Sequence, residues 1–278
     1  MDIGVPYRLL GRVDVGPLAE RLNALAEEDW IHTEFNRQAI AGRSHGIARA
    51  IYLRKEWHPG MHKYVSTDMW DVVKHWSRKW GGDPARVMPF MREDYGGLQV
   101  YTFPQMLEWH ELVSPILEAA LAGLRKAGMR SQVPGKGANK GAAKGSAKGR
   151  PAPGGPVWGV LTRATFVKLP AGYVIDEHID GQAVAALTHR LHVAVTGAEC
   201  VQYRCDGQAF QVRDGDIFEL NNKRPHAVVN RGPADRVNIM LEYFPNPDPP
   251  SLGFPRFRQA ASQASAPAPA GDAEVPAE

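Results

Sequence analysis

The chain has 278 residues, of which 44% are hydrophobic and 9% aromatic, enough apolar material for a folded core. Its formal net charge is +3, but removing the five cations of one Gly-rich stretch, residues 136–150, changes this charge to −2. A folded part without excess positive charge argues against a nucleic-acid-binding surface.

The sequence also lacks membrane and secretion signals. No stretch approaches the ~18 apolar residues that span a bilayer, and no apolar run follows a basic start, as it would in a secretory signal. The only two cysteines, Cys200 and Cys205, are too few for a disulfide framework. We therefore expect a cytoplasmic protein with free thiols and no membrane partner.

The beginning of the chain is predicted to form a helix and then a strand. Residues 17–30 follow the possible capping residue Asp14, and Leu18, Leu22 and Leu25 recur at helical spacing. Residues 44–54 alternate in the manner of a strand.

Two further helices are predicted before the middle of the chain. Residues 68–80 place three tryptophans and a valine on one side, which is typical of a helix packed on a core. Residues 104–128 form the second pattern, and Pro115 within it predicts a kink or break.

Residues 131–155 differ from their surroundings. Lysine recurs there at every fourth position, which would line one face of a helix. The interspersed glycines each cost about 1 kcal/mol in a helix, so a flexible, positively charged insert is predicted instead. Residues 259–278 contain mainly Ala, Pro and acids and are predicted to be disordered. The expected division is therefore an N-terminal portion at 1–130, the insert, a core at 156–258, and this tail.

The second half of the chain has the pattern of an antiparallel β structure. Short apolar runs alternate with Gly, Pro and Asp, which predicts a sandwich or barrel. Asp206-Gly207 is the best hairpin candidate because a type I′ turn needs positive φ at both central positions. The predicted strands are 160–169, 189–195, 209–213, 216–220, 226–231 and 235–244.

One short motif carries the chemistry. His178 and Asp180 are two residues apart, so on an extended strand both side chains leave the same face. An imidazole and a carboxylate there can bind one divalent ion, with His226 as the candidate third ligand from another strand. Two histidines and one carboxylate leave three coordination positions open, as in non-haem Fe(II) oxygenases.

An arginine strengthens this interpretation, because an H-x-D pair alone is weak in a chain with ten histidines. Arg236 stands ten residues after His226, and a guanidinium is suited to bidentate capture of a carboxylate. It could reach the far carboxylate of a keto acid that chelates the metal. The alternative is an arginine at a strand start, paired with Asp235 or another surface acid.

The segment from about Thr162 to Phe244 resembles the aspartyl/asparaginyl β-hydroxylase family of 2-oxoglutarate-dependent oxygenases. The matching stretches are HID followed by THRLHVAV, and then FELNNKRPHAVVNRGPADRVNIMLEYF. The resemblance implies a mainly β (α+β) fold with a double-stranded β-helix core, similar to a jelly roll or cupin, and an N-terminal helical portion.

The resemblance also implies roles for individual residues. Iron would be held by His178 and His226, and Arg236 would bind the distal carboxylate of 2-oxoglutarate. Arg190 and His192 match positions that help to hold this cosubstrate. Asn222 falls where the family has a polar residue near the metal. Those roles make all four non-ligand positions candidates for cofactor binding.

This sequence departs from the animal members of the family, which have a small residue where Asp180 stands and use two histidines only. The acid is present here, as in the wider oxygenase superfamily and in related free-amino-acid hydroxylases. The departure makes Fe(II) binding by the full triad more credible. It also loosens the link to the animal substrate, a residue within a folded protein.

The predicted function is therefore an Fe(II)- and 2-oxoglutarate-dependent dioxygenase that uses O2 to hydroxylate an aspartyl/asparaginyl-type substrate at an unactivated carbon. Arg49 and Arg54 are candidates for contact with an acidic substrate. Alternatives are the same chemistry on a free amino acid or small metabolite, of the proline or arginine type, and a metal-binding cupin without oxygenase activity. A further alternative is an interaction protein in which the lysine-rich insert acts.

The other histidines and both cysteines are not expected to bind the metal. A thiolate would favour softer metal chemistry, and these histidines lack ligand-like spacing and are assigned to the surface or to packing. His189 should point to the opposite face from its neighbour Arg190. The excluded histidines are His32, His45, His58, His62, His75, His110 and His189.

Overall fold

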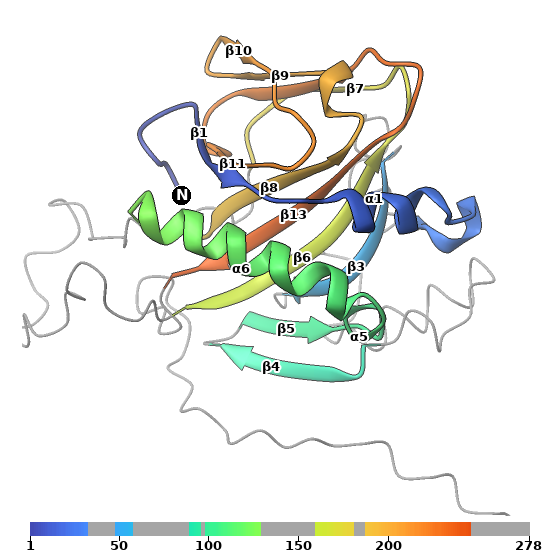
Figure 1. Ribbon diagram of the computed structural model, residues 1–278. Helices are drawn as coiled ribbons and strands as arrows, with labels where there is room; N and C mark the ends of the chain where they lie inside the picture. Colours follow the sequence, from blue (N-terminus) through green and yellow to red (C-terminus); the bar gives the residue numbers. More distant parts are fainter. Residues whose placement is uncertain (33–47, 58–88, 96–97, 129–158, 181–186, 246–278) are drawn as a thin grey trace, which may run out of the picture.

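The computed structural model describes residues 1–32, 48–57, 89–95, 98–128, 159–180 and 187–245. Within them, two antiparallel sheets face one another and one long helix crosses the outer face of the larger sheet (Figure 1). The predicted mainly β, jelly-roll architecture is confirmed.

The larger sheet includes strands from both halves of the chain. Its order is β1 (Tyr7–Arg12), β11 (Asp216–Leu220), β8 (His189–Thr196), β13 (Arg236–Phe244), β6 (Val160–Leu169), β3 (Arg49–Trp57), β5 (Leu98–Thr102) and β4 (Met91–Tyr95), with β2 (Ile31–His32) paired to β3. The smaller sheet runs β10 (Gln208–Phe210), β9 (Val201–Cys205), β12 (His226–Asn230) and β7 (Val174–His178). Strands from the N-terminal half thus lie at both edges of the larger sheet, on either side of strands from the C-terminal half.

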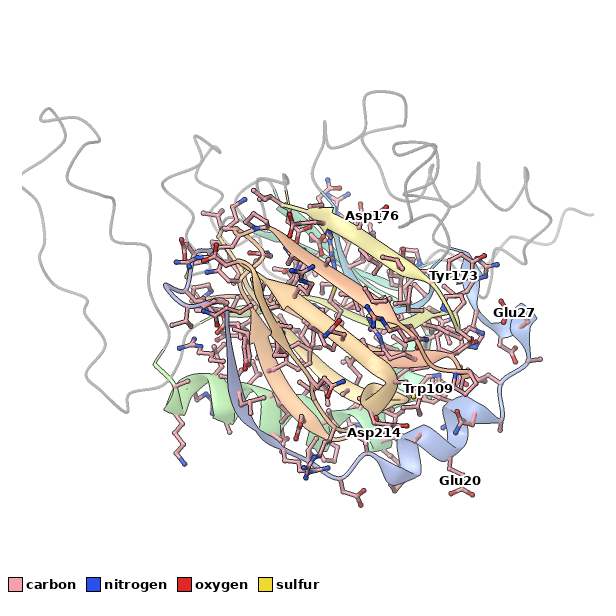
Figure 2. All side chains as sticks on the ribbon, turned by 90° about the horizontal axis from the view of Figure 1, so that it is seen from above. Glu20, Glu27, Trp109, Tyr173, Asp176 and Asp214 are labelled. Atoms are coloured by element: carbon pink, nitrogen blue, oxygen red, sulfur yellow. The ribbon has the colours of Figure 1, made fainter. Side chains whose placement is uncertain are left out.

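Among the described residues, the α-helices are α1 (Gly16–Asn23), α5 (Gln105–Glu108) and α6 (His110–Lys126). Short 3-10 turns lie at Glu27–Asp29 and Ala198–Cys200. Helices α1 and α6 cover the outer face of the larger sheet, whereas the smaller sheet covers its inner face. In Figure 2, Trp109 lies on the helix side of the sheet, and Asp176, on β7, lies on the opposite side.

Strict alternation along the central strands separates the two faces of the larger sheet. On β6, Ala164 and Phe166 join the apolar cluster under the helices, while Thr165 between them points into the space between the sheets. Trp109, at the start of α6, packs edge-on against Phe166 with ring centroids 5.1 Å apart. The outer face therefore packs an apolar core under the helices, whereas the inner face combines a second apolar cluster with buried polar groups.

Several predicted elements are confirmed, some with different ends. The predicted bounds of β6 and β11 are those observed. Asp206 and Gly207 have φ of 50° and 76°, as the predicted turn between β9 and β10 requires. The strand predicted at 209–213 ends at Phe210, where its pairing with β9 ends. The strand predicted at 44–54 begins at Arg49 and extends to Trp57, with 44–47 outside the described residues.

Two helix predictions were wrong in detail. The helix predicted at 17–30 ends at Asn23, and a separate 3-10 turn follows, in which the Asp29 carboxylate accepts the backbone N–H of Ala26 at 3.0 Å. Pro115 lies inside α6 without breaking it. The predicted helix is broken instead at Trp109, whose φ of −102° and ψ of 3° are not helical. Trp109, which is buried, is the single residue between α5 and α6.

Some elements were not anticipated, and some predictions cannot be compared. Strands β1, β2, β4, β5 and β9 were not predicted. The helix predicted at 68–80, the insert at 131–155 and the tail at 259–278 lie outside the described residues. The division into four segments therefore stays a prediction.

Candidate metal centre

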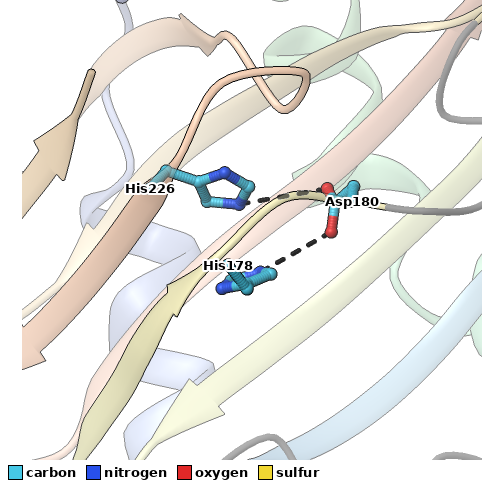
Figure 3. A group of neighbouring side chains, drawn as sticks. All are labelled: His178, Asp180 and His226. Atoms are coloured by element: carbon cyan, nitrogen blue, oxygen red, sulfur yellow. Dashed lines mark ion pairs between the residues drawn. The ribbon is translucent and has the colours of Figure 1, made fainter.

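The two predicted histidine ligands face each other across neighbouring strands of the smaller sheet. His178 is the last residue of β7 and His226 the first of β12, and the antiparallel register pairs them directly. Their ring centroids lie 4.2 Å apart (Figure 3). Strand pairing thus brings together two side chains that are 48 positions apart in the sequence.

The carboxylate of Asp180 lies beside both rings, just beyond the end of β7. Asp180 Oδ1 is 3.6 Å from His178 Nε2, and Oδ2 is 4.0 Å from His226 Nε2 (Figure 3). The backbone holds the residue in place, since its N–H donates to the Asn222 carbonyl at 3.1 Å and its own carbonyl accepts from Lys223 Nζ at 2.8 Å.

The three side chains form a group that fits a metal ion. One ligand atom from each lies within 4.8 Å of the others, and this is the only such group of three or more His, Cys, Asp or Glu in the described part of the chain. With bonds of about 2.1 Å to nitrogen, ligand atoms at right angles would lie about 3 Å apart. The ligand atoms, which are up to 4.8 Å apart here, would have to move closer together around the ion.

Both imidazoles are oriented for coordination through Nε2. His178 Nδ1 lies 2.8 Å from the carbonyl oxygen of Asp176, and His226 Nδ1 lies 2.9 Å from that of Arg224. A ring nitrogen facing a carbonyl oxygen must carry the proton, so each neutral ring presents its Nε2 lone pair to Asp180. In both cases the carbonyl oxygen belongs to the residue two positions before the histidine.

The charge states of Asp180 and His226 also suit a cation. Burial would raise the pKa of Asp180, but the Arg190 guanidinium and the two imidazoles hold it well below its usual range. Burial lowers the pKa of His226 and favours the neutral ring that binds metals. Burial also opposes protonation of His178, but its pKa is raised because the Asp180 carboxylate and the Asp176 carbonyl outweigh that effect.

Arg190 occupies a different position from the one implied for a cosubstrate-binding group. Its Nη1 is ion-paired with Asp180 Oδ2, and its Nη2 with Glu242, to which Nε also donates at 3.1 Å. All three nitrogens of the guanidinium thus contact carboxylates of this chain. The structure brings Arg190 to the centre, but as a partner of the acid.

Arg236 is buried and His192 half-buried on the inner face, and both have polar atoms without hydrogen-bond partners in the described part of the chain. Both ring nitrogens of His192 and Nε of Arg236 are shielded from solvent and lack a hydrogen-bond partner in the described part of the chain. Burial and the guanidinium groups of Arg190 and Arg236 lower the pKa of His192 to about 3. Such orphaned groups carry a desolvation cost that a polar ligand would relieve.

The alternative for Arg236, a salt bridge to Asp235, is not observed. Asp235 lies 3.8 Å from Lys168 Nζ and accepts the backbone N–H of Ala171 at 3.1 Å. Among the described residues no carboxylate lies within 4 Å of Arg236, whose guanidinium carbon is 5.7 Å from the centre of the Tyr203 ring. Its charge remains available to an acidic ligand.

Other predicted positions fall close to the centre or away from it. Asn222 is buried and supports Asp180 through its backbone carbonyl, and its Oδ1 is 3.5 Å from the amino nitrogen of Met1. Arg49 Nε donates to Glu27 at 3.1 Å, and Arg54 is ion-paired with Glu93. The two arginines are thus engaged by other acids.

The histidines predicted to lie outside the site behave accordingly where they are described. His189 is fully buried on the helix side, 2.6 Å from Glu219, and so points away from Arg190 as expected. His110 is exposed on α6. The side chains of the remaining five lie outside the described residues.

Sequence reasoning missed several polar residues of the inner face. The Thr165 hydroxyl is buried without a partner, in the register row that also contains Tyr52, Met240 and His192. A second row contains Arg163, Glu242 and Arg190. The available signal was the occurrence of charged residues at inward positions of strands that are otherwise apolar.

Comparison with known proteins identifies the domain that carries this centre. Residues 158–245 match the family model described as Aspartyl/Asparaginyl beta-hydroxylase. This segment is similar to that family. It spans β6 to β13 and contains both histidines, Asp180 and Arg236, so the resemblance seen in the sequence is confirmed for the barrel. The match supports a hydroxylase-type, oxidoreductase function. No curated protein matches the chain.

Solved structures with a similar barrel are distant in sequence. An oxidoreductase of the 2OG-Fe(II) oxygenase family from Burkholderia pseudomallei is 14% identical, covers 34% of this chain and 48% of its own, and has a TM-score of 0.28. A predicted oxalate decarboxylase from Thermotoga maritima is 15% identical. The match covers 30% of this chain and 67% of that protein, with a TM-score of 0.26. A Cupin 2 conserved barrel domain protein from Salinispora arenicola is 20% identical. The match covers 29% of this chain and 60% of that protein, with a TM-score of 0.24. The chain thus spans only part of the length of these proteins.

Among the described residues, no helix combines the length and the apolar character needed to cross a membrane.

Proposed function

We propose that this chain is an Fe(II)- and 2-oxoglutarate-dependent dioxygenase that hydroxylates an aspartyl/asparaginyl-type substrate. The observation that carries the proposal is the convergence of two imidazole Nε2 atoms on one carboxylate, in a barrel that also buries an arginine without a carboxylate partner in the described part of the chain. His178, Asp180 and His226 would hold the metal.

The residues of the site would have distinct tasks in this reaction. Bound Fe(II), together with 2-oxoglutarate and O2, supplies the oxidising power for hydroxylation of an unactivated carbon. The protein holds the two histidines on paired strands, and the carbonyl oxygens that face their Nδ1 atoms leave Nε2 of each ring for the metal. Three ligands from the chain leave positions for a chelating keto acid and for O2.

Arg236 is assigned to the distal carboxylate of 2-oxoglutarate. A guanidinium binds a carboxylate through two parallel charge-assisted hydrogen bonds. His192, neutral because its pKa is about 3, and the unpartnered hydroxyl of Thr165 are further polar groups for the same ligand. The orphaned atoms of all three side chains would then gain partners.

The substrate class includes a free amino acid or small metabolite as the alternative to a peptidyl Asp or Asn. The family match favours the aspartyl/asparaginyl type. Asp180 favours the free-amino-acid alternative, because it completes the triad that the related amino-acid hydroxylases share. A non-oxygenase cupin is disfavoured by Arg236, since such a protein has no need for a buried carboxylate clamp.

An anaerobic titration tests the proposal directly. Fe(II) added with 2-oxoglutarate to the full-length protein should produce a visible metal-to-keto-acid charge-transfer band, and admission of O2 with a substrate should then yield succinate. Arg236→Met should retain metal binding but require about 10- to 150-fold more 2-oxoglutarate, as expected for loss of a charge-assisted pair of about 1.5–3 kcal/mol.

A matched control uses Arg204, an exposed arginine of the smaller sheet. Arg204→Met should leave the 2-oxoglutarate requirement unchanged. Metal binding without any band, or an unchanged requirement in Arg236→Met, would contradict the assignment and favour a metal-binding cupin of another activity.

A further inference from the structure

A chain of alternating charges, the first three buried and the last two half-buried, runs along the inner face of the larger sheet and ends at Asp180. Its members come from strands β3, β6, β13 and β8, and Asp180 is its only member from outside that sheet. In order they are Glu56, Arg163, Glu242, Arg190 and Asp180.

Each link in this chain is a direct contact. Arg163 Nε donates to Glu56 at 2.9 Å, and Arg163 Nη1 lies 3.1 Å from Glu242 Oε1. Glu242 Oε1 also accepts from Arg190 Nε at 3.1 Å, while Oε2 accepts from the Thr188 hydroxyl at 3.3 Å. Both carboxylates are essentially inaccessible to solvent. Such charges are tolerated only when fully paired, so each member restricts its neighbours.

The last link divides the two oxygens of Asp180. Oδ2 is ion-paired with Arg190 Nη1, whereas Oδ1 lies 3.6 Å from His178 Nε2. A carboxylate with one oxygen held by a guanidinium presents the other oxygen in a defined direction. Free rotation of the Asp180 side chain is thereby removed before any metal arrives.

We propose that Arg190 and Glu242 are positioning residues for the metal centre: Glu242 holds the Arg190 guanidinium, and Arg190 holds Asp180 so that Oδ1 faces the metal. Arg163 and Glu56 complete the charge pairing behind them. This inference rests on the proposed metal site, and it assigns Arg190 to the acid ligand instead of the cosubstrate. It also explains why Glu242 is buried between two arginines on the inner face of the larger sheet.

The test measures metal binding, not turnover. Mn(II) serves as the probe, because the electron paramagnetic resonance signal of the free ion gives a dissociation constant for the full-length protein without cosubstrate or oxygen. Groups that orient metal ligands typically contribute 10–100-fold to metal affinity. Glu242→Gln, which keeps the shape but not the charge, should therefore weaken Mn(II) binding by about 10-fold or more.

The matched control is Glu219→Gln. Glu219 is equally buried in the same sheet and is also paired with an arginine, Arg8, but it lies on the helix face beside His189. Its replacement should lower stability without changing the Mn(II) dissociation constant. Equal weakening in both variants would overturn the proposal, because it would indicate a general loss of folding. Unchanged affinity in Glu242→Gln would overturn it as well.

A second variant covers the case in which Glu242→Gln does not fold. Arg190→Lys keeps the positive charge, but a single ammonium lacks the rigid fork that spans two carboxylates. It should also weaken Mn(II) binding by about 10-fold or more, and wild-type affinity would contradict the positioning role. If the wild-type protein itself binds no Mn(II) or Fe(II), the proposed function fails. If it binds and the variants match it, only this inference fails.

Discussion

The two faces of the larger sheet use the same strands for opposite purposes. Under the helices, alternate residues of β6, β8 and β13 form one continuous apolar cluster with α1 and α6. Between the sheets, the intervening residues form a second apolar cluster, which includes Leu169 and Ala194, next to buried polar and charged groups such as Glu242. A period of two in the strands thus confines the groups that would bind ligands to the inner face and keeps them off the face that packs on the helices.

Even the buried ion pairs follow this division. On the helix face, Glu219 joins His189 to Arg8, whose Nη1 also donates to the carbonyl of Ala127 at 3.0 Å, at the end of α6. On the inner face, Glu242 joins Arg163 to Arg190 and thereby leads to Asp180. The comparison teaches that the neighbours of a buried glutamate decide its role, since burial is the same for both.

The largest expected effect is on stability, from the helix face. Phe166 is fully buried and packs on Trp109, so Phe166→Ala should lower the free energy of unfolding by about 3–5 kcal/mol through lost burial and a residual cavity. Urea denaturation followed by tryptophan fluorescence measures it. The Mn(II) dissociation constant of the folded fraction should stay unchanged, and a parallel loss of affinity would break the separation of the two faces.

The next effect belongs to the inner side and concerns the metal. His226→Ala removes one ligand and should weaken Mn(II) binding more than about 100-fold, beyond what loss of an orienting group costs. The free-ion resonance signal measures the dissociation constant. His189→Gln is the control, because it changes a buried histidine of the helix face. Metal affinity that falls in the control as well would contradict the division.

A pH dependence follows from His192. Its pKa in the folded protein is about 3, compared with about 6.5 in an unfolded chain. Between these values the unfolded state binds more protons, so the free energy of unfolding falls as the pH drops below about 6.5. Between pH 8 and pH 5 this group alone should remove about 2 kcal/mol.

His192→Phe provides the measurement. The ring stacks on Phe218 with centroids 5.1 Å apart, so phenylalanine keeps the shape and loses the titration. Urea denaturation of the metal-free protein, in the presence of a chelator, should show a loss of stability on acidification that is smaller in the variant by about 2 kcal/mol. Equal losses in both proteins would mean that His192 is solvated.

Much of the inner side could be predicted from the sequence. The spacing of His178 and Asp180 and the apolar runs of the second half indicated strands and a shared face, and the structure pairs His178 with His226. Asp180 itself lies past the end of β7, held by Asn222 and Lys223 instead of by strand pairing. Local periodicity does not specify such long-range backbone contacts.

The charge chain could not be predicted for the same reason. Glu56 and Arg163 are 107 positions apart, and Arg190 and Glu242 are 52 apart. In the sequence Arg163 and Glu242 are single charges in largely apolar strands, and Glu56 follows two other charges, patterns that fit a sheet edge or a bulge equally well. Only the register of β13 between β6 and β8 places Glu242 opposite both arginines.

The smallest expected effect sharpens the comparison most, because its sign differs from that of the others. The hydroxyl of Thr165 is buried without a partner, so the folded protein carries its desolvation cost. Thr165→Val removes the hydroxyl and keeps the shape, and should raise the free energy of unfolding by about 1 kcal/mol in the ligand-free protein. The same variant should weaken binding of 2-oxoglutarate in the anaerobic titration, since it removes a polar group assigned to that ligand. On the helix face, a change that removes a satisfied hydrogen bond would lower the free energy of unfolding. On the inner face, removal of an unpartnered group should raise the free energy of unfolding and weaken ligand binding. Destabilisation by Thr165→Val would show that the hydroxyl serves the fold, and the division between the two faces would then fail on β6 itself.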